Sequence, residues 1–333
     1  MPTIQEVAKQ AGVSVATVSR VLNDNGPVSS STRKRVQAVI DELNYQPNLL
    51  GRNLRRSETR MILVLLENIS NPFYSKIVKG MEDTAHENGY NVLICNTNTD
   101  IDLESIYLDF LKNKLVDGVI FTCTAMVTKE FNKLAKHYPV VLCNEYNKDI
   151  KAPIVTIDNE IAGYEATSHL IKLGHKKIGM ISVDNVGSSY DRMKGYIRAI
   201  EEAGLVVNDD YIVYHTFSYK GGMRGIKQLF EVDDPPTAIF CISDLIAVGA
   251  IKELKSMGLS VPKDVAIVGF DNNSIAPMYD PSITTIAQPR YDIGKKTMEI
   301  MLQRIKGNAE NNSVVKLEHE LIIRDSTLPS VNY

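Results

Sequence analysis

The sequence predicts an all-α domain over residues 1–47, followed by an α/β core of two Rossmann-like subdomains. Three observations support this prediction. Before residue 45, apolar side chains recur at helical spacing and are interrupted by Gly12. From Met61 onward, short apolar runs alternate with helical stretches, a pattern typical of parallel sheets with helices on both faces. The alternation occurs twice, so we expect two subdomains facing each other across a cleft.

Two short helices are expected at the start of the chain. Apolar residues within 4–11 share one helix face, and Gly12 ends that helix in a turn that suits a positive φ. Ser14 can cap a second helix over residues 15 to about 23. Two short helices joined by a glycine-containing turn form a helix-turn-helix candidate.

A third helix is expected from about Ser31 to Asn44, with Arg33, Lys34 and Arg35 near its start. A helix N-terminus favours acidic groups, so these basic side chains suggest phosphate contacts; an ordinary solvated face is the alternative. Residues 1–60 carry nine Lys and Arg against five Asp and Glu, whereas the remainder carries 28 against 35. Basic charge gathered at one end fits a module that faces DNA.

The outward face of the second helix carries side chains that could read DNA. Val15 and Ala16 gain nothing from exposure to water but can contact thymine methyl groups in a major groove. Arg20 can form a bidentate pair with guanine. Thr17 and Ser19 suit phosphate contacts that set the register of the helix on DNA.

Motifs beyond the helix-turn-helix narrow the interpretation. They are TIQEVAKQAGVSVATVSRVLN at the start, YQPN and LGRNLRR within 45–56, SNPFY, the R-x-x-GY at Arg192, VGFDN and TTIAQP. In this order, over nearly the whole chain, they resemble the LacI/GalR family of bacterial repressors, whose core is like that of type I periplasmic sugar-binding proteins. The resemblance implies a repressor of carbohydrate metabolism or transport genes that binds a palindromic double-stranded operator as a homodimer and holds a sugar-type effector in its cleft.

The resemblance also implies a hinge helix within residues 48–60, which pairs with its copy in the minor groove. Leu54 matches the leucine that wedges into a flexible central base step, and Arg55 lies beside it. Such a short helix is unstable alone, and Gly51 weakens it by roughly 1 kcal/mol, so we expect it to fold on DNA. The residues expected at the DNA are Thr3, Val15, Ala16, Thr17, Ser19, Arg20, Asn23, Tyr45, Asn48, Leu54 and Arg55.

Candidate effector residues follow the apolar runs of the core, because ligands of open parallel sheets bind beyond the carboxyl ends of strands. In the first half these polar and aromatic residues are Asn71, Phe73, Tyr74, Asn144 and Glu145. In the second half they are Ser243, Asp244 and Asp271. Aromatic faces and hydrogen-bonding groups together suit a sugar. The family resemblance adds Arg192, Phe217 and Gln288.

Arg192 and Asp271 are expected to contribute most to recognition, because a guanidinium and a carboxylate can clamp one polyol from two sides. A structural salt bridge across the cleft is the alternative. The chain departs from the ribose-binding pattern, with Asn144 and Glu145 in place of Asp-Arg and Ser243 in place of Asn. A carboxylate in place of a cation disfavours a sugar phosphate, so we expect a neutral or amino sugar.

The core is expected to divide into two discontinuous subdomains after a hinge and linker over residues 48–60. A helix from Tyr291 to about Lys306 and a strand over 314–323 should return to the first half. The first subdomain then comprises 61–160 with 290–322, and the second comprises 161–289 with 323–333. Crossings near 158–162, 285–290 and 322–325 would act as a hinge for cleft closure.

Other functional classes find little support in the sequence. No segment reaches the ~18 apolar residues of a membrane span and no signal peptide opens the chain, so we expect a cytoplasmic protein that joins the nucleoid when bound to DNA. Four distant cysteines in apolar runs indicate buried thiols and no zinc site or disulfide framework. Without nucleotide-binding glycine motifs or clustered histidines, we expect no enzyme, cofactor or metal.

Two alternatives share the core. A transport-type sugar receptor would need a signal peptide and would have no use for residues 1–57. A regulator controlled by a phosphorylated carrier protein docked on the first subdomain, as in carbon catabolite control, is closer. Lys76, Lys79 and Glu82 could form its docking surface, although such a pattern is usually a solvated face. Induction or corepression, the effector's identity, and dimer or tetramer stay open.

Overall fold

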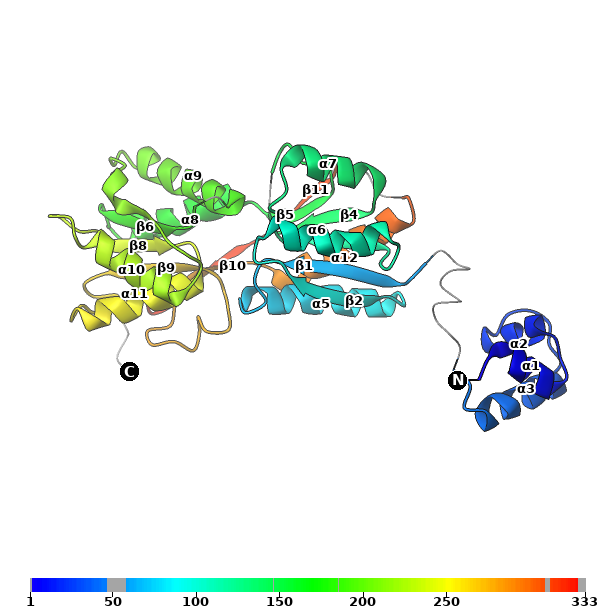
Figure 1. Cartoon of the computed structure of the whole chain (residues 1–333). Helices are drawn as coiled ribbons and strands as arrows, with labels where there is room; N and C mark the ends of the chain where they lie inside the picture. The colour runs from blue at the N-terminus through cyan, green and yellow to red at the C-terminus, as the bar shows by residue number, and fades with distance from the viewer. Residues whose placement is uncertain (1, 47–57, 146, 185, 309–311, 329–333) are drawn as a thin grey trace. The chain divides into compact units, whose positions relative to one another are not determined.

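The computed structural model describes residues 2–46, 58–145, 147–184, 186–308 and 312–328. The chain separates into two compact units, residues 1–59 and 60–333 (Figure 1). Three helices form the first unit: α1 (Ile4–Ala11), α2 (Val15–Leu22) and α3 (Ser30–Glu42). The predicted helical module is therefore confirmed, with boundaries within two residues of those expected.

Local hydrogen bonds explain where the first helices begin and end. At α1, the Thr3 hydroxyl accepts from the Glu6 backbone N–H, and the Thr3 backbone N–H donates to the Glu6 carboxylate at 2.6 Å. Gly12 ends that helix with a φ of 63°, as expected of its turn. Ser14 caps α2 by accepting from the Thr17 backbone N–H. The apolar faces of all three helices meet in one small core.

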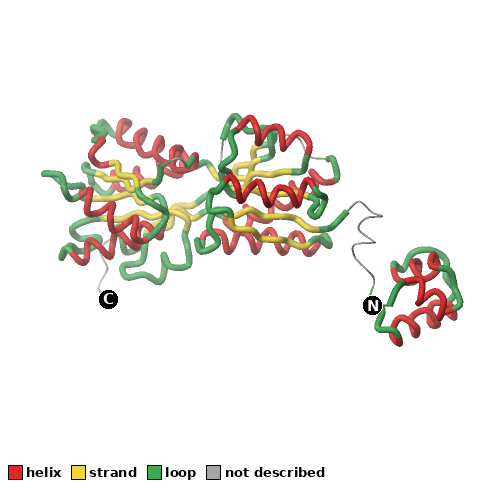
Figure 2. The backbone as a smooth tube through the Cα atoms, in the orientation of Figure 1, coloured by secondary structure: helices red, strands yellow, loops and turns green. Residues whose placement is uncertain are grey.

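The first lobe of the larger unit contains a parallel sheet of order β11-β5-β4-β3-β1-β2. Its strands are β1 (Met61–Leu66), β2 (Asn91–Asn96), β3 (Gly118–Phe121), β4 (Val140–Cys143), β5 (Ile154–Ile157) and β11 (Val314–Leu317). Its helices are α5 (Phe73–Glu87), α6 (Ile101–Lys112), α7 (Thr128–His137) and α12 (Arg290–Ile305). Helices cover the sheet, as Figure 2 shows, and α12 returns to this lobe as predicted.

The second lobe contains a sheet of order β12-β10-β9-β8-β6-β7, in which β12 alone runs antiparallel to its neighbour. Its strands are β6 (Ile178–Ser182), β7 (Ile212–Tyr214), β8 (Ala238–Cys241), β9 (Ala266–Asp271), β10 (Thr284–Ala287) and β12 (Glu320–Ile322). Its helices are α8 (Asn159–Lys172), α9 (Gly187–Glu202), α10 (Tyr219–Leu229) and α11 (Asp244–Ser256), with a short 3-10 turn at Asp209–Tyr211. The two Rossmann-like subdomains are thus confirmed.

Three segments connect the lobes: residue 158, residues 288–289 and residues 318–319. The first two lie where we expected crossings. The third differs, because we placed 314–323 in the first lobe and a crossing near 322–325. Instead β12 pairs with residues 285–287 of β10, which puts residues 320–322 in the second lobe. The prediction failed because a three-residue strand takes its sheet from long-range pairing that local sequence does not reveal.

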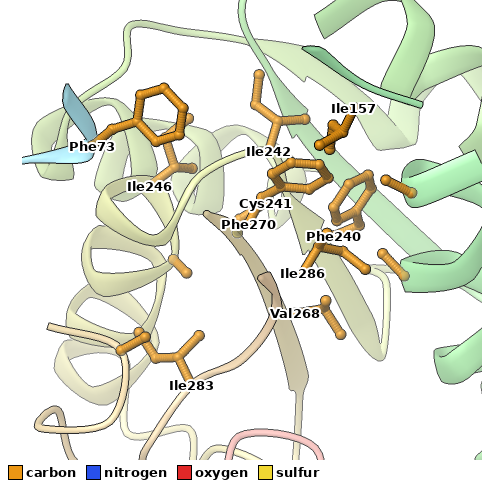
Figure 3. Close-up of a cluster of buried hydrophobic side chains, with 14 of the residues drawn as sticks. Phe73, Ile157, Phe240, Cys241, Ile242, Ile246, Val268, Phe270, Ile283 and Ile286 are labelled. Atoms are coloured by element: carbon orange, nitrogen blue, oxygen red, sulfur yellow. The ribbon is translucent and has the colours of Figure 1, made fainter. Parts of the chain in front are cut away.

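Buried side chains from both lobes belong to one hydrophobic cluster. Figure 3 shows Phe73 and Ile157 of the first lobe in this cluster with Ile242, Ile246 and Phe270 of the second. The lobes therefore share packed apolar contacts next to the connecting segments. No helix in the described part of the chain is long and apolar enough to cross a lipid bilayer.

Candidate functional site

Helix α2 presents the residues predicted to contact DNA bases. Val15, Ala16 and Arg20 are exposed, and Thr17 and Ser19 are partly exposed. The opposite face of the helix is buried in the module. Exposed small apolar groups next to an arginine at the start of a helix match the chemistry of a major-groove reading face.

Three other predicted DNA contacts have local partners. Thr3 caps α1, and the Asn23 side chain donates to the Ser19 backbone oxygen at 2.7 Å. Tyr45 is 9% exposed and packs in the core of the module, so its ring supports the fold. The remaining predictions, Asn48, Leu54 and Arg55, lie outside the described residues.

Two arginines of the module are held near the turn after α2. The aliphatic chain of Arg20 lies against Gly26, where a Cβ would come 3.5 Å from the arginine Cδ. Arg33 forms an ion pair with Asp24 at 2.6 Å between exposed side chains. Exposed pairs of this kind contribute about 0–1 kcal/mol, so Arg33 can exchange this partner for a phosphate at small cost.

A cavity lies between the two lobes of the core. From the first lobe it is lined by Glu67, Asn71, Phe73, Tyr74, Thr122, Cys123, Asn144 and Glu145, and from the second by Val186, Ser188, Arg192, Phe217 and Asp271. Eight of the predicted effector residues are among these. The cavity volume is about 40 Å³, whereas small-molecule pockets measure about 300–1,000 Å³. Admitting a sugar therefore requires the lobes to move apart.

Arg192 is the main cationic group of the cavity, and it is rigidly held on α9. Its Nε donates to Asn159 Oδ1 at 3.0 Å, and its Nη1 donates to the Ile242 backbone oxygen at 2.7 Å. The guanidinium carbon lies 3.6 Å from the centre of the Phe270 ring. Within the described residues Nη2 has no protein acceptor, so it is free to donate to a ligand. A close approach of α8 and α9 positions the arginine, since a Cβ on Gly163 would come 2.2 Å from the Arg192 backbone oxygen.

Asp271 ends β9 and faces the same cavity. Its carboxylate accepts from Gln288 Nε2 at 2.8 Å, and Gln288 belongs to the second connecting segment. Burial raises the pKa of Asp271 to about 6, against the lowering effect of Arg192. No ion pair within 4.0 Å joins Asp271 to Arg192 in the described chain. The arrangement thus favours two separate polar groups for a ligand over a structural salt bridge.

Ser243, Asp244 and Gln288 do not line the cavity, and the structure gives each a local role. Ser243 caps α11 by accepting from the Ile246 backbone N–H. Asp244 accepts from Thr285 Oγ1 at 2.7 Å and from the Asn273 backbone N–H at 2.6 Å, behind Asp271. Burial raises the pKa of Asp244 to about 8. These residues support the second-lobe wall from behind.

Glu145, beyond β4, bridges the cavity to the second lobe. Its two carboxylate oxygens accept from the Ser188 backbone N–H at 3.1 Å and from the Ser188 hydroxyl at 3.3 Å. Burial raises the pKa of Glu145 to about 7, and the Ser188 hydrogen bonds only partly offset that rise. The contact closes the cleft at the cost of burying a carboxylate without a cation beside it.

Glu67 is a cavity residue that was not predicted from the sequence, although it directly follows the run ILVLL that ends β1. Its carboxylate accepts from the Tyr74 hydroxyl at 3.3 Å. Burial raises the pKa of Glu67 and places the pKa of Tyr74 well above its usual value. Ser188, Val186, Thr122 and Cys123 were also missed.

Among the residues that the structure describes, the site has neither a cluster of metal-ligating side chains nor a reactive thiol. Among the described residues, no group of three His, Cys, Asp or Glu side chains could hold a metal ion. Burial raises the pKa of Cys123 to about 12, so this cavity thiol stays protonated at neutral pH. The groups present can therefore bind and orient a polar ligand through hydrogen bonds.

Comparison with known proteins finds related sequences along nearly the whole chain. A family model described as periplasmic binding proteins and sugar binding domain of the LacI family matches residues 59–325. A second model, described as bacterial regulatory proteins of the lacI family, matches residues 3–48. The two matches cover the core and the helical module in turn.

Individual relatives match over their full length. The chain is 38% identical over 327 residues to the HTH-type transcriptional repressor CytR of Escherichia coli (strain K12), covering 98% of this chain and 96% of that protein. It is 38% identical over 328 residues to catabolite control protein A of Priestia megaterium, covering 98% and 99%. The solved lac repressor dimer bound to operator and the anti-inducer ONPF aligns with a TM-score of 0.89 at 25% identity, covering 98% of this chain and 99% of that one.

Proposed function

Because the chain belongs to the lacI family of bacterial regulatory proteins, we propose that it represses genes of carbohydrate metabolism or transport in response to a neutral or amino sugar bound in the interlobe cleft. Repressors of this family bind operator DNA as dimers and respond to small effectors. We further propose that the protein acts in the bacterial cytoplasm, on the nucleoid when bound to its operator.

The observation that supports an effector site most strongly is the separation of Arg192 from Asp271. Both groups are buried at the cavity, both are held by other residues, and no ion pair joins them. Arg192 donates to Asn159, which directly follows the first connecting segment, and Asp271 accepts from Gln288 of the second connecting segment. A polyol that bridges them would therefore bias the angle between the lobes.

On DNA, we propose that Val15, Ala16 and Arg20 contact bases, and that Thr17 and Ser19 contact phosphates. The exposed face of α2 supports this assignment. One such module reads only half of a palindromic site, which accords with a dimer. From the family resemblance, we also propose that Asn48, Leu54 and Arg55 contact DNA.

An operator selected from random DNA with the full chain tests the DNA contacts. Replacing Arg20 by Ala should weaken the selected site by about 1–3 kcal/mol relative to random DNA, because a base contact carries specificity. Lys34→Ala, on exposed α3, is the matched control, and it should weaken both DNAs alike if it acts at all. Equal loss of specific and random binding in Arg20→Ala would contradict a base-reading role.

The effector claim is tested by operator affinity in the presence of a panel of sugars, with Arg192→Ala alongside. We expect one class of sugar to change the affinity of the wild type and to have no effect on the variant. A response that survives in Arg192→Ala would contradict the cleft as the effector site.

Control by a phosphorylated carrier protein is the second candidate, and it is favoured by the similarity to catabolite control protein A. Its predicted surface on α5 is partly occupied, since Lys79 pairs with Asp83 at 2.6 Å and Asp83 accepts from Tyr291 of α12 at 3.1 Å. The same operator assay separates the two functions. Enhancement by a phosphorylated carrier protein without any response to sugars would select this alternative.

A further inference from the structure

We propose that the effector is a polyol that carries an amino group, and that this group binds at Glu145 on the first-lobe wall of the cavity, which Glu67 also lines. This inference rests on the proposed function and specifies the class of ligand that the cleft takes.

The two walls of the cavity differ in charge. The first-lobe lining contains two carboxylates, Glu67 and Glu145, and no Lys, Arg or His. The second-lobe lining contains Arg192 and Asp271, one of each sign. An anionic ligand would bring a third negative charge to the first-lobe wall, which is unfavourable where water is largely excluded.

Among the described residues, neither first-lobe carboxylate has a cation at ion-pair distance, although Arg192, farther across the cavity, has a lowering effect on the pKa of Glu145. Glu67 accepts from the Tyr74 hydroxyl, and Glu145 accepts from the backbone and hydroxyl of Ser188. No ion pair within 4.0 Å involves either group. Largely buried carboxylates are usually paired with a cation or neutralised, so this wall lacks a positive partner that a ligand can supply.

Both carboxylates belong to the first-lobe wall, and each raises the pKa of the Tyr74 hydroxyl and of the Cys123 thiol. Tyr74 lies at the start of α5, and Cys123 follows β3, so both of these groups belong to the same wall. An ammonium group at Glu145 would therefore lie on a wall whose charged side chains are all acidic.

A further buried atom of this wall calls for a donor. Asn144 Oδ1 is buried and has no hydrogen-bond partner. The Thr122 hydroxyl donates to the Leu65 backbone oxygen, and the Tyr74 hydroxyl donates to Glu67. An ammonium group offers three donors and no acceptor, whereas a phosphate offers acceptors and negative charge. The wall thus matches an amine.

The amino group must be basic, because only a protonated amine brings positive charge to the acidic wall. An amino group on a sugar carbon meets this requirement. Aromatic side chains on both walls, Phe73, Tyr74 and Phe217, can stack on the face of the sugar. The hydroxyl groups are then placed toward Arg192 and Asp271 on the second-lobe wall.

The experiment is calorimetry on the full chain with pairs that differ at the amino group. The pairs are D-glucosamine and D-glucose, and D-galactosamine and D-galactose, with glucose 6-phosphate as the anionic probe. In at least one pair we expect the amino member to bind at least about tenfold more tightly, a difference of about 1.4 kcal/mol. Glu145→Gln should reduce that ratio to about threefold or less, whereas Glu87→Gln, at the exposed end of α5, should preserve it.

Four outcomes would overturn the inference. They are equal or tighter binding of the hydroxyl member in both pairs, tight binding of the phosphate, an amine preference that persists undiminished in Glu145→Gln, and binding of no compound. In the first two the cleft remains the effector site, so the proposed function stands. In the last, the operator assay with a phosphorylated carrier protein decides whether the cleft function fails as well.

Discussion

The two walls of the interlobe cavity are built from the same kind of strand ends but differ in how their charges are held. On the second-lobe wall, Arg192 and Asp271 are fixed by hydrogen bonds to Asn159, Ile242 and Gln288. On the first-lobe wall, Glu145 has only Ser188, a residue of the opposite lobe. One wall is preorganised before the cleft closes, whereas the other gains its partner by closing.

This difference indicates how a ligand can control the cleft. Closure brings Glu145 against Ser188 and raises the pKa of its carboxyl to about 7 through burial. A ligand that supplies donors or positive charge to Glu145 lowers the cost of closure, and the second-lobe wall holds the rest of that ligand. The two lobes are joined by the connecting segments, by their shared apolar cluster and by the hydrogen bonds of Glu145 with Ser188, so closure of the cleft can be coupled to the attached DNA-binding module.

The largest expected effect comes from removing the fixed cation. Arg192→Ala leaves Asn159 Oδ1 and the Ile242 carbonyl without this donor and removes one of the two cations, with Arg290, that lower the pKa of Asp271. We therefore expect a loss of about 4 kcal/mol in the free energy of unfolding of the core. Denaturant unfolding of the full chain measures it. Arg198→Ala, six residues along α9 in an exposed pair with Glu160, is the control and should cost about 0.5 kcal/mol. Similar losses of stability in both variants would show that the hydrogen bonds of Arg192 contribute no more than an exposed ion pair.

Replacing Glu145 on the first-lobe wall by a neutral residue should increase the free energy of unfolding, whereas Arg192→Ala decreases it. The pKa of Glu145 is raised from 4.5 to about 7 in the folded protein, so folding disfavours its ionised form. That penalty is absent below about pH 4.5 and grows as the pH rises through 7. Glu145→Gln should therefore stabilise the core by about 2–3 kcal/mol at pH 8 and change it little at pH 5.

Thermal unfolding of wild type and Glu145→Gln between pH 5 and 8 measures that difference. The exposed Glu201→Gln serves as the control and should leave the pH profile unchanged. A Glu145→Gln variant that is less stable than the wild type at pH 8 would mean that the ionised carboxylate is well solvated. The two walls would then not differ in how well their charged groups are stabilised.

A smaller effect is expected from shifting the second-lobe wall without changing any cavity side chain. A Cβ at Gly163 would come 2.2 Å from the Arg192 backbone oxygen, so Gly163→Ala must push α9 away from α8. We expect a loss of about 2 kcal/mol in stability and weaker effector binding. Lys172→Ala, at the exposed end of α8, is the control. Effector affinity that stays unchanged in Gly163→Ala would argue against precise placement of Arg192.

The smallest effect concerns the contact that joins the walls. Ser188→Ala removes the 3.3 Å hydrogen bond to Glu145 and keeps the backbone bond at 3.1 Å. We expect a loss of about 1 kcal/mol at pH 8, where Glu145 is ionised, and less at pH 5. Thermal unfolding at both pH values checks it, and Ser189→Ala beside it is the comparison. A loss of stability that does not depend on pH would show that the Ser188 hydroxyl does not stabilise the ionised form of Glu145.

Most of the fold could be predicted because its elements are long and locally marked. The runs at β1, β4, β8 and β9 are continuous and buried, and glycine and capping residues mark the helices of the first unit. Short elements could not be predicted in the same way. The three-residue strands β7 and β12 carry too little pattern, and β12 takes its place in the second sheet from its pairing with β10.

The candidate site was predictable to the extent that strand ends define it. Asn71, Asn144, Glu145 and Asp271 follow strands and do line the cavity. The same rule fails for Ser243, because its hydroxyl is used to cap α11, a local hydrogen bond that competes with a ligand. Ser188 lies on the first turn of α9 and meets Glu145 only through the arrangement of the two lobes, which no local pattern reports.

The central claim is that a positively charged ligand group binds at Glu145 on the first-lobe wall. The most direct test measures how many protons are released when the ligand binds. Calorimetry of an amino compound at pH 6, in two buffers of different ionisation enthalpy, gives the number of protons released. At that pH Glu145 is largely protonated in the free protein, so an ammonium beside it should release about 0.5–1 proton, and Glu145→Gln should release none. Binding without proton release in the wild type, or the same release in Glu145→Gln, would contradict the account.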